Sequence, residues 1–86
     1  MPSKKSRANR ALGKAIRSAR VRRGETQEGF SRREDVPIDR SYFGAHERGE
    51  VNVMLDTIVT VAHGLNLTVA ELLKQAGPFS RAHPES

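Results

Sequence analysis

The stretch from residue 26 to residue 49 constrains the fold of this chain more than any other part of it. Thr26 is a good N-cap, because its side-chain oxygen can accept a hydrogen bond from a backbone N–H of the helix that follows. Pro37 disfavours helical geometry at the residue before it, so the first helix cannot continue through this point. Asp39 can cap a second short helix, and Gly49 can end it in the left-handed conformation. The pattern therefore predicts two short helices joined by a tight break, at residues 27–33 and 40–48.

Helical patterns fill most of the remaining chain. Apolar residues at helical spacing predict helices over residues 8–23 and 55–65, and a capping box from Thr68 to Glu71 opens another that Gly77 ends. The chain shows no strand pattern, internal repeat or low-complexity tract. We predict an all-α fold, a compact five-helix bundle, divided into a basic arm, the domain and a tail at residues 1–7, 8–77 and 78–86. The side chains expected to face the core are Leu12, Ala15, Ile16, Ala19, Phe30, Leu55, Ile58, Val59, Ala62, Leu65, Leu72, Leu73 and Ala76.

The composition excludes several classes of protein. A chain of 86 residues with 36% hydrophobic content makes one domain with a small core, and a second subunit would bury more apolar surface. The chain has no cysteine, which removes disulfides, thiolate metal sites and a cysteine nucleophile. No apolar run approaches the roughly 20 residues that span a bilayer, and the N-terminus lacks the apolar segment of a signal peptide. We expect a soluble cytoplasmic protein with no membrane partner.

Positive charge is concentrated at one end of the chain. The formal net charge is +5, but residues 1–24 hold nine Lys and Arg residues and no acid, whereas the rest holds six basic and ten acidic residues. This asymmetry indicates a surface that faces a polyanion, such as nucleic acid. A solvated, solubilising helix face is the alternative. Insertion into a membrane surface is disfavoured, because the apolar stripe of Leu12, Ala15, Ile16 and Ala19 is narrow and its side chains are small.

No arrangement of catalytic or metal-binding residues stands out. Ser31, Ser41 and His46 lack a nucleophile elbow or an oxyanion motif, and no glycine loop could cradle a phosphate. His63 has no second metal ligand at helical spacing. We therefore expect no enzymatic activity, no metal site and no cofactor.

Two short helices joined by a tight break are the parts of a helix-turn-helix, whose second helix lies in the DNA major groove. Four segments extend this pattern, and in this order they resemble the xenobiotic-response-element family of helix-turn-helix regulators, which includes phage Cro-type repressors. The segments are LGKAIRSARVRRGETQE, DRSYFGAHERGE, N-x-x-L-D-T-x-x-x-x-A at residues 52–62, and LNLTVAELL. The segment DRSYFGAHERGEVN is also similar to restriction–modification controller proteins. The resemblance implies a lambda-repressor-like domain that binds DNA in a prokaryotic, phage or mobile-element setting, associated with the nucleoid.

The resemblance also implies roles for individual residues. Arg40 and Ser41 match the positions that open the recognition helix and reach base edges, and an Arg there can offer two hydrogen bonds to guanine. Gln27 matches the glutamine that binds a phosphate, and Arg20 matches an arginine that pairs with Glu47. Phe43 and His46 fall where the family buries apolar side chains. The base-contacting positions are Arg40, Ser41, Tyr42, Gly44 and Ala45. The phosphate-contacting positions are Gln27, Arg10, Arg17, Arg20 and Thr26.

The sequence departs from the family pattern in two ways. The segment from Phe30 to Glu47 is about two residues longer than usual, and the common turn glycine is missing. Gly44 and Ala45 offer no side-chain hydrogen bond, so we expect sequence choice to rest mainly on Arg40, with Ser41, water and DNA shape contributing.

These features predict a transcription regulator that binds a pseudo-palindromic operator in double-stranded DNA as a homodimer, its own promoter included. It would act by occlusion or by direct contact with RNA polymerase. We expect the dimer interface to include Leu67, Val69 and Phe79. The alternative is a protein-interaction module, antitoxin-like or anti-regulator, whose recognition helix has degenerated. Nonspecific coating of nucleic acid through the basic arm is a third reading.

Overall fold

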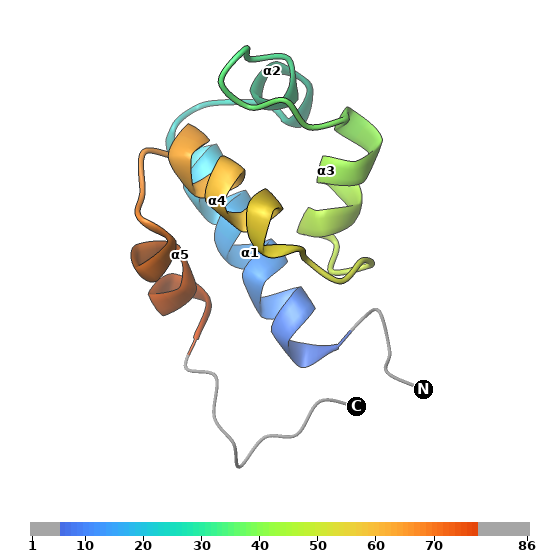
Figure 1. Ribbon diagram of the computed structural model, residues 1–86, viewed down its shortest axis with the longest axis vertical. Helices are drawn as coiled ribbons and strands as arrows, with labels where there is room; N and C mark the ends of the chain where they lie inside the picture. Colours follow the sequence, from blue (N-terminus) through green and yellow to red (C-terminus); the bar gives the residue numbers. More distant parts are fainter. Residues whose placement is uncertain (1–5, 78–86) are drawn as a thin grey trace.

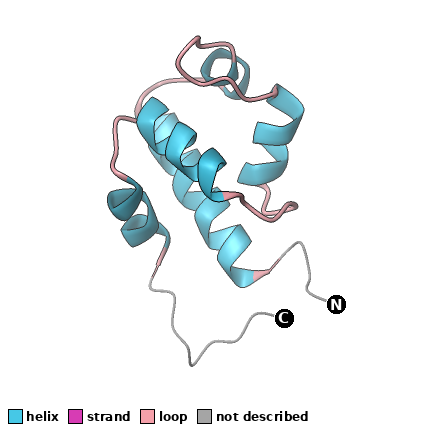
Figure 2. Ribbon diagram, in the orientation of Figure 1, coloured by secondary structure: helices cyan, strands magenta, loops and turns pink. Residues whose placement is uncertain are grey.

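The computed structural model describes residues 6–77, and within this range it contains five α-helices and no strand. The helices are α1 (Arg7–Arg22), α2 (Gln27–Ser31), α3 (Arg40–Glu47), α4 (Leu55–Gly64) and α5 (Val69–Ala76). The predicted all-α fold of five helices is confirmed. Helix α1 runs through the middle of the molecule, with α3 on one side, α5 on the other and α4 in front (Figure 1). Short loops connect the helices (Figure 2).

The helix boundaries follow from local capping. The Ser6 side chain accepts a hydrogen bond from the Asn9 backbone N–H at 3.2 Å. Helix α1 therefore begins one residue earlier than the apolar pattern indicated. Thr26, Asp39 and Thr68 cap the following helices as predicted, and Thr68 forms a reciprocal capping box with Glu71. Helix α2 ends at Ser31, sooner than expected, because the chain enters the turn there.

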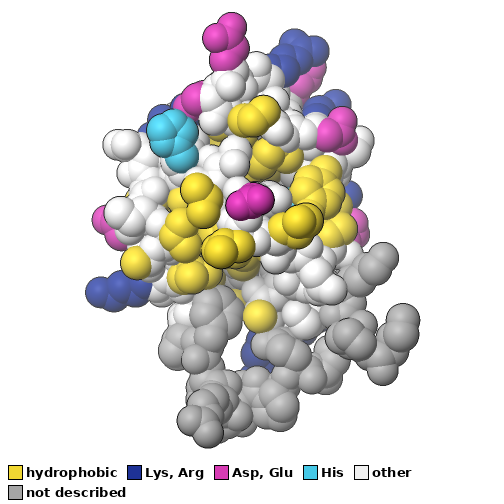
Figure 3. Space-filling view, viewed as in Figure 1, with side chains coloured by type: hydrophobic (Ala, Val, Ile, Leu, Met, Phe, Trp, Pro, Cys, Tyr) yellow, Lys and Arg dark blue, Asp and Glu magenta, His cyan; other side chains and the backbone are white. Residues whose placement is uncertain are grey.

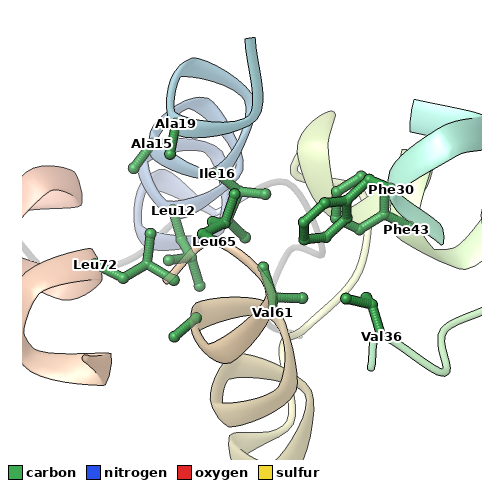
Figure 4. Packing of buried hydrophobic residues seen from close by; sticks show 11 residues of the cluster. Leu12, Ala15, Ile16, Ala19, Phe30, Val36, Phe43, Val61, Leu65 and Leu72 are labelled. Atoms are coloured by element: carbon green, nitrogen blue, oxygen red, sulfur yellow. The ribbon is translucent and has the colours of Figure 1, made fainter. Parts of the chain in front are cut away.

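The core takes buried apolar side chains from all five helices and from the turn between α2 and α3. The Phe30 and Phe43 rings lie with their centroids 4.9 Å apart at one end of the buried cluster, Leu72 of α5 lies at the other end, and Ile16 and Val61 lie between them (Figure 4). Aromatic pairs at this distance add to the stabilisation that burial gives. Helices α2 and α3 are therefore fixed to each other by the same rings that fix them to α1.

The buried face of α4 differs from the predicted one. Val61 is fully buried, whereas Leu55 and Val59 are 68% and 49% exposed. The sequence of α4 carries apolar residues on more than one face, so helical spacing alone did not select the face that packs inward. The prediction that Leu55 and Val59 face the core is wrong, and these side chains remain on the surface.

The turn between α2 and α3 is anchored, although it lacks the usual glycine. Val36 is fully buried, and its backbone N–H donates to the Arg33 carbonyl at 3.1 Å. The Arg33 guanidinium donates to the Gly64 carbonyl at 2.9 Å and pairs with Glu25 and Asp35. The longer turn is thus held by one apolar side chain inside and one arginine outside.

Candidate nucleic-acid interface

Helix α3 begins with a well-defined cap that leaves its first side chains exposed. The Asp39 carboxylate accepts hydrogen bonds from the Ser41 and Tyr42 backbone N–H groups at 3.0 and 3.2 Å. Arg40 and Ser41 are both exposed, and Tyr42 is half-buried with its ring edge against His46, the centroids 4.4 Å apart. The residues predicted to read bases therefore stand on the outer surface of the start of α3.

A buried ion pair fixes α3 to α1. The Arg20 Nε and Nη2 atoms donate to the two carboxylate oxygens of Glu47 at 2.7 and 3.0 Å, which is the bidentate geometry of a strong arginine–carboxylate pair. The Arg20 Nη1 atom also donates to the Glu25 carbonyl at 2.6 Å. The hydrogen bond that Arg20 donates to Glu47 raises the pKa of the Arg20 guanidinium, which stays charged. The structure thus brings Arg20 and Glu47 together.

Gln27 links this pair to α2. Its side-chain Nε2 donates to Glu47 Oε1 at 2.9 Å, so α1, α2 and α3 share one carboxylate. Arg20 is only 7% exposed, and its three nitrogens all donate within the protein. This placement favours a structural role for Arg20 over the predicted phosphate contact. The orientation of α3 is set by a network that does not depend on DNA.

A hollow of about 230 Å³ lies on the outer side of α2 and α3. It brings together four of the predicted DNA-contacting residues with one that the sequence analysis missed. The lining residues are Gln27, Arg40, Ser41, Gly44 and Arg48. Its polar groups are side-chain amide, hydroxyl and guanidinium groups, which are the donors that recognise base edges and phosphates.

Arg48 is the residue that the sequence analysis overlooked. Its guanidinium covers Gly44: a Cβ atom built on Gly44 would lie 3.1 Å from Arg48 Nη1 and 3.4 Å from Gln27 Oε1. Arg48 Nε donates to Glu50 Oε1 at 3.0 Å. The sequence held a signal for this, because a basic residue four positions after a glycine in a helix can lie back over the gap that the glycine leaves.

The basic residues of α1 occupy more than one side of that helix. Arg10 is exposed, and its backbone and Cγ pack directly against Gly49, just beyond the end of α3. Arg17 is exposed and lines a surface hollow with Ser18, Val21 and Arg22. Arg22 points to the other side of the molecule, where its Nη2 donates to Gln75 of α5 at 3.1 Å. Thr26 remains the cap of α2 through its bond from the Gly29 N–H at 2.9 Å.

The surface beside α4 carries the exposed apolar side chains. Met54, Leu55 and Val59 are 65%, 68% and 49% exposed. In Figure 3 hydrophobic side chains gather on this face of the molecule, with an acidic side chain among them. Of the residues predicted for a dimer interface, Leu67 and Val69 are half-buried and pack against the core, and Phe79 lies outside the described residues.

Residues 6–77 contain neither a cluster of metal ligands nor a membrane-spanning helix. No group of three or more His, Cys, Asp or Glu side chains could hold a metal ion in this range. None of the helices in the same range has the length and apolar character needed to cross a membrane.

The architecture matches solved structures of known regulators. The clp gene regulator ClgR from Corynebacterium glutamicum is 32% identical, with a TM-score of 0.73 over 80% of this chain and 86% of its own. The restriction–modification controller protein C.AhdI from Aeromonas hydrophila is 35% identical, with a TM-score of 0.67 over 73% of this chain and 92% of its own.

A transcription factor described as hypothetical, NHTF from Neisseria, is 30% identical, with a TM-score of 0.69 over 85% of this chain and 80% of its own. No protein-family model and no curated protein sequence matches the chain. Each of these three matches covers 73% or more of this chain at an identity of 30% or more. The chain belongs to the Cro-like, xenobiotic-response-element family of helix-turn-helix transcription regulators.

Proposed function

We propose that this protein is a sequence-specific transcription regulator that places α3 in the major groove of operator DNA. The observation that carries the proposal is the exposed position of Arg40 on a helix that is anchored to the rest of the fold. It stands exposed in the first turn of a helix that Asp39 caps and that Glu47 ties to α1 and α2. A preorganised arginine at this place can form two hydrogen bonds to guanine O6 and N7.

The other residues of the hollow and its rim would complete the contact. Ser41 would donate to a base edge, while Tyr42 and Ala45 would contact the groove beside it. Gln27 and Thr26 at the start of α2, and Arg10 and Arg17 on α1, would hold the phosphates that set the register of α3. Phosphate contacts of this kind position the protein, and base contacts select the sequence.

We further propose that the regulator acts as a two-fold dimer on a pseudo-palindromic operator. The exposed Met54, Leu55 and Val59 are the apolar side chains that a second copy would cover, with Leu67 and Val69 contributing where they remain accessible. Isolated exposed apolar residues are common, but three within six positions form a patch. The recognition helices of such dimers enter major grooves about 34 Å apart.

The relatives support a role in gene control. One similar structure is a gene regulator and another is a restriction–modification controller protein. We propose that this chain controls transcription on a prokaryotic or phage genome, its own promoter included, by occluding the promoter or by contacting RNA polymerase directly.

Footprinting on the DNA upstream of its own gene tests this function. We expect two protected half-sites whose centres are about one helical turn apart. Uniform protection of all DNA would point to nonspecific coating. Absence of protection at micromolar protein would contradict DNA binding and favour a protein-interaction module.

A further inference from the structure

We infer that Arg48 is a second base-reading residue and that Gly44, which has no side chain, leaves the space that the Arg48 guanidinium occupies. This inference rests on the proposed function. Arg48 follows α3 as its C-cap residue, and sequence position alone would place its side chain at the end of the recognition helix, away from the bases. The geometry places its guanidinium elsewhere.

Side chains on an α-helix lean toward the helix N-terminus and lie over the residue four positions earlier. Arg48 follows this rule, because its Nη1 atom lies 3.1 Å from the point where a Gly44 side chain would begin. The guanidinium therefore occupies the middle of α3, in the same hollow as Arg40 and Ser41. Arg48 supplies at position 44 the hydrogen-bond donors that glycine lacks.

The guanidinium keeps the donors that guanine recognition requires. Glu50 accepts from Arg48 Nε at 3.0 Å, and this bond leaves the Nη1 and Nη2 groups for two parallel bonds to guanine O6 and N7. The Arg48 and Glu50 side chains are 56% and 37% exposed, so DNA can reach the pair. Glu50 acts as a positioning residue that limits the orientations of Arg48.

Gly44 matters to this arrangement because of the space it leaves. It is covered by Arg48 and Gln27, and any side chain at this position would push the guanidinium outward. Glycine in the middle of a helix is unfavourable for folding. Its presence in an eight-residue recognition helix therefore fits a role in leaving space for the Arg48 guanidinium.

The test measures affinity for the operator and for a set of duplexes in which each base pair is changed in turn. Wild type, Arg40→Ala and Arg48→Ala are compared, with Arg22→Ala as a matched loss of one arginine on the far side of α1. We expect Arg40→Ala and Arg48→Ala each to lose discrimination of about 5- to 150-fold, at two different base pairs of the half-site. Arg22→Ala should lose none.

Two more variants separate base reading from simple charge. Arg48→Lys keeps the charge and loses the planar fork, so we expect it to lose discrimination at the same base pair as Arg48→Ala. Gly44→Ala should weaken discrimination at that base pair while leaving the protein folded, since only the flexible end of Arg48 must move.

The outcomes distinguish this inference from the proposed function. If wild type is sequence-specific but Arg48→Ala weakens binding to every duplex equally and lowers the salt slope by about one, Arg48 holds phosphate and the inference is overturned. If wild type shows no sequence preference, both the inference and the proposed function are overturned.

Discussion

At the scale of single residues, the Arg20–Glu47 pair holds the recognition helix α3 against α1. Glu47 has a side chain only 1% exposed, and both of its oxygens accept hydrogen bonds from Arg20, with a further bond from Gln27. The Arg20 guanidinium compensates for the burial of the Glu47 carboxylate. A buried pair of this kind fixes geometry, and the loss of one partner strands the other.

Loss of the Arg20 cation should destabilise the fold. Arg20→Met leaves the Glu47 carboxylate buried without its cation and should lower the free energy of unfolding by about 3–5 kcal/mol in urea denaturation. The double variant Arg20→Met with Glu47→Leu removes both charges and should recover most of that loss. If the double variant is as unstable as the single one, the stranded charge is not the cause.

His46 is the second residue whose environment predicts a measurable effect. It is 1% exposed, neither ring nitrogen has a hydrogen-bond partner among residues 6–77, and burial lowers its pKa. The Tyr42 ring edge packs against it. Because the unfolded state takes up a proton at higher pH than the folded state, stability is full above about pH 6.5 and falls as the pH drops below that value.

We predict that His46→Leu removes the loss of stability that protonation of His46 causes at low pH. The variant should be more stable than wild type by about 1 kcal/mol at pH 8, since it deletes an unsatisfied polar group, and the difference should widen at pH 5.5. Thermal unfolding at the two pH values measures this. His63→Gln, which changes an exposed histidine on α4, serves as the control. An equal pH dependence in wild type and His46→Leu would contradict the account.

At the scale of helices, the sequence predicted what depends on local chemistry. The caps at Thr26, Asp39 and Thr68 follow from hydrogen bonds within a few residues, so the starts of α2, α3 and α5 could be predicted from the sequence. The left-handed residues Gly24, Gly49 and Asn66 have φ of 75°, 71° and 59°, as the endings of three helices required. The all-α fold could be predicted for the same reason.

What could not be predicted depends on packing between helices. The buried face of α4 was assigned incorrectly, because its apolar residues allow more than one face. Val36 fills the core from within the turn, where no periodicity marks it. Of the interface, Arg40 and Ser41 could be placed by the motif, whereas Arg48 lies outside it and is marked in the sequence only by its spacing of four residues from Gly44.

Close helix contact gives the prediction at this scale. A Cβ atom on Gly13 would collide with the backbone carbonyls of His46 and Glu47, so α1 and α3 touch at this glycine. Gly13→Ala should lower the free energy of unfolding by about 1–3 kcal/mol and weaken DNA binding by tilting α3. Urea denaturation compares it with Gly44→Ala, another mid-helix glycine, which should be neutral or more stable by up to about 1 kcal/mol. Similar losses in both would show that backbone contact at Gly13 is not decisive.

At the scale of the whole molecule, charge and apolar surface are divided between two regions. Helices α2 and α3 offer polar and cationic groups around one hollow, and the region of Met54, Leu55 and Val59 offers apolar side chains. Such a division suits a protein that binds DNA with one surface and its own copy with another.

This division predicts the effect of charge in the apolar patch. Leu55→Lys and Val59→Lys should each weaken dimerisation at least about tenfold in sedimentation equilibrium while leaving the folded monomer intact, because both side chains are already exposed in it. Affinity for a single half-site should not fall. Val21→Lys alters another apolar side chain, 55% exposed on α1, and serves as the control. Unchanged dimerisation in both α4 variants would place the interface elsewhere.

The proposed function depends above all on α3 reading sequence through Arg40. Fluorescence anisotropy can measure it directly, with wild type, Arg40→Ala and Arg22→Ala on the DNA upstream of the protein's own gene and on a scrambled duplex at the same salt. We predict a preference of at least about a thousandfold for wild type and Arg22→Ala, and loss of most of it in Arg40→Ala. Equal affinity of wild type for the two duplexes, or an unchanged preference in Arg40→Ala, would contradict the claim.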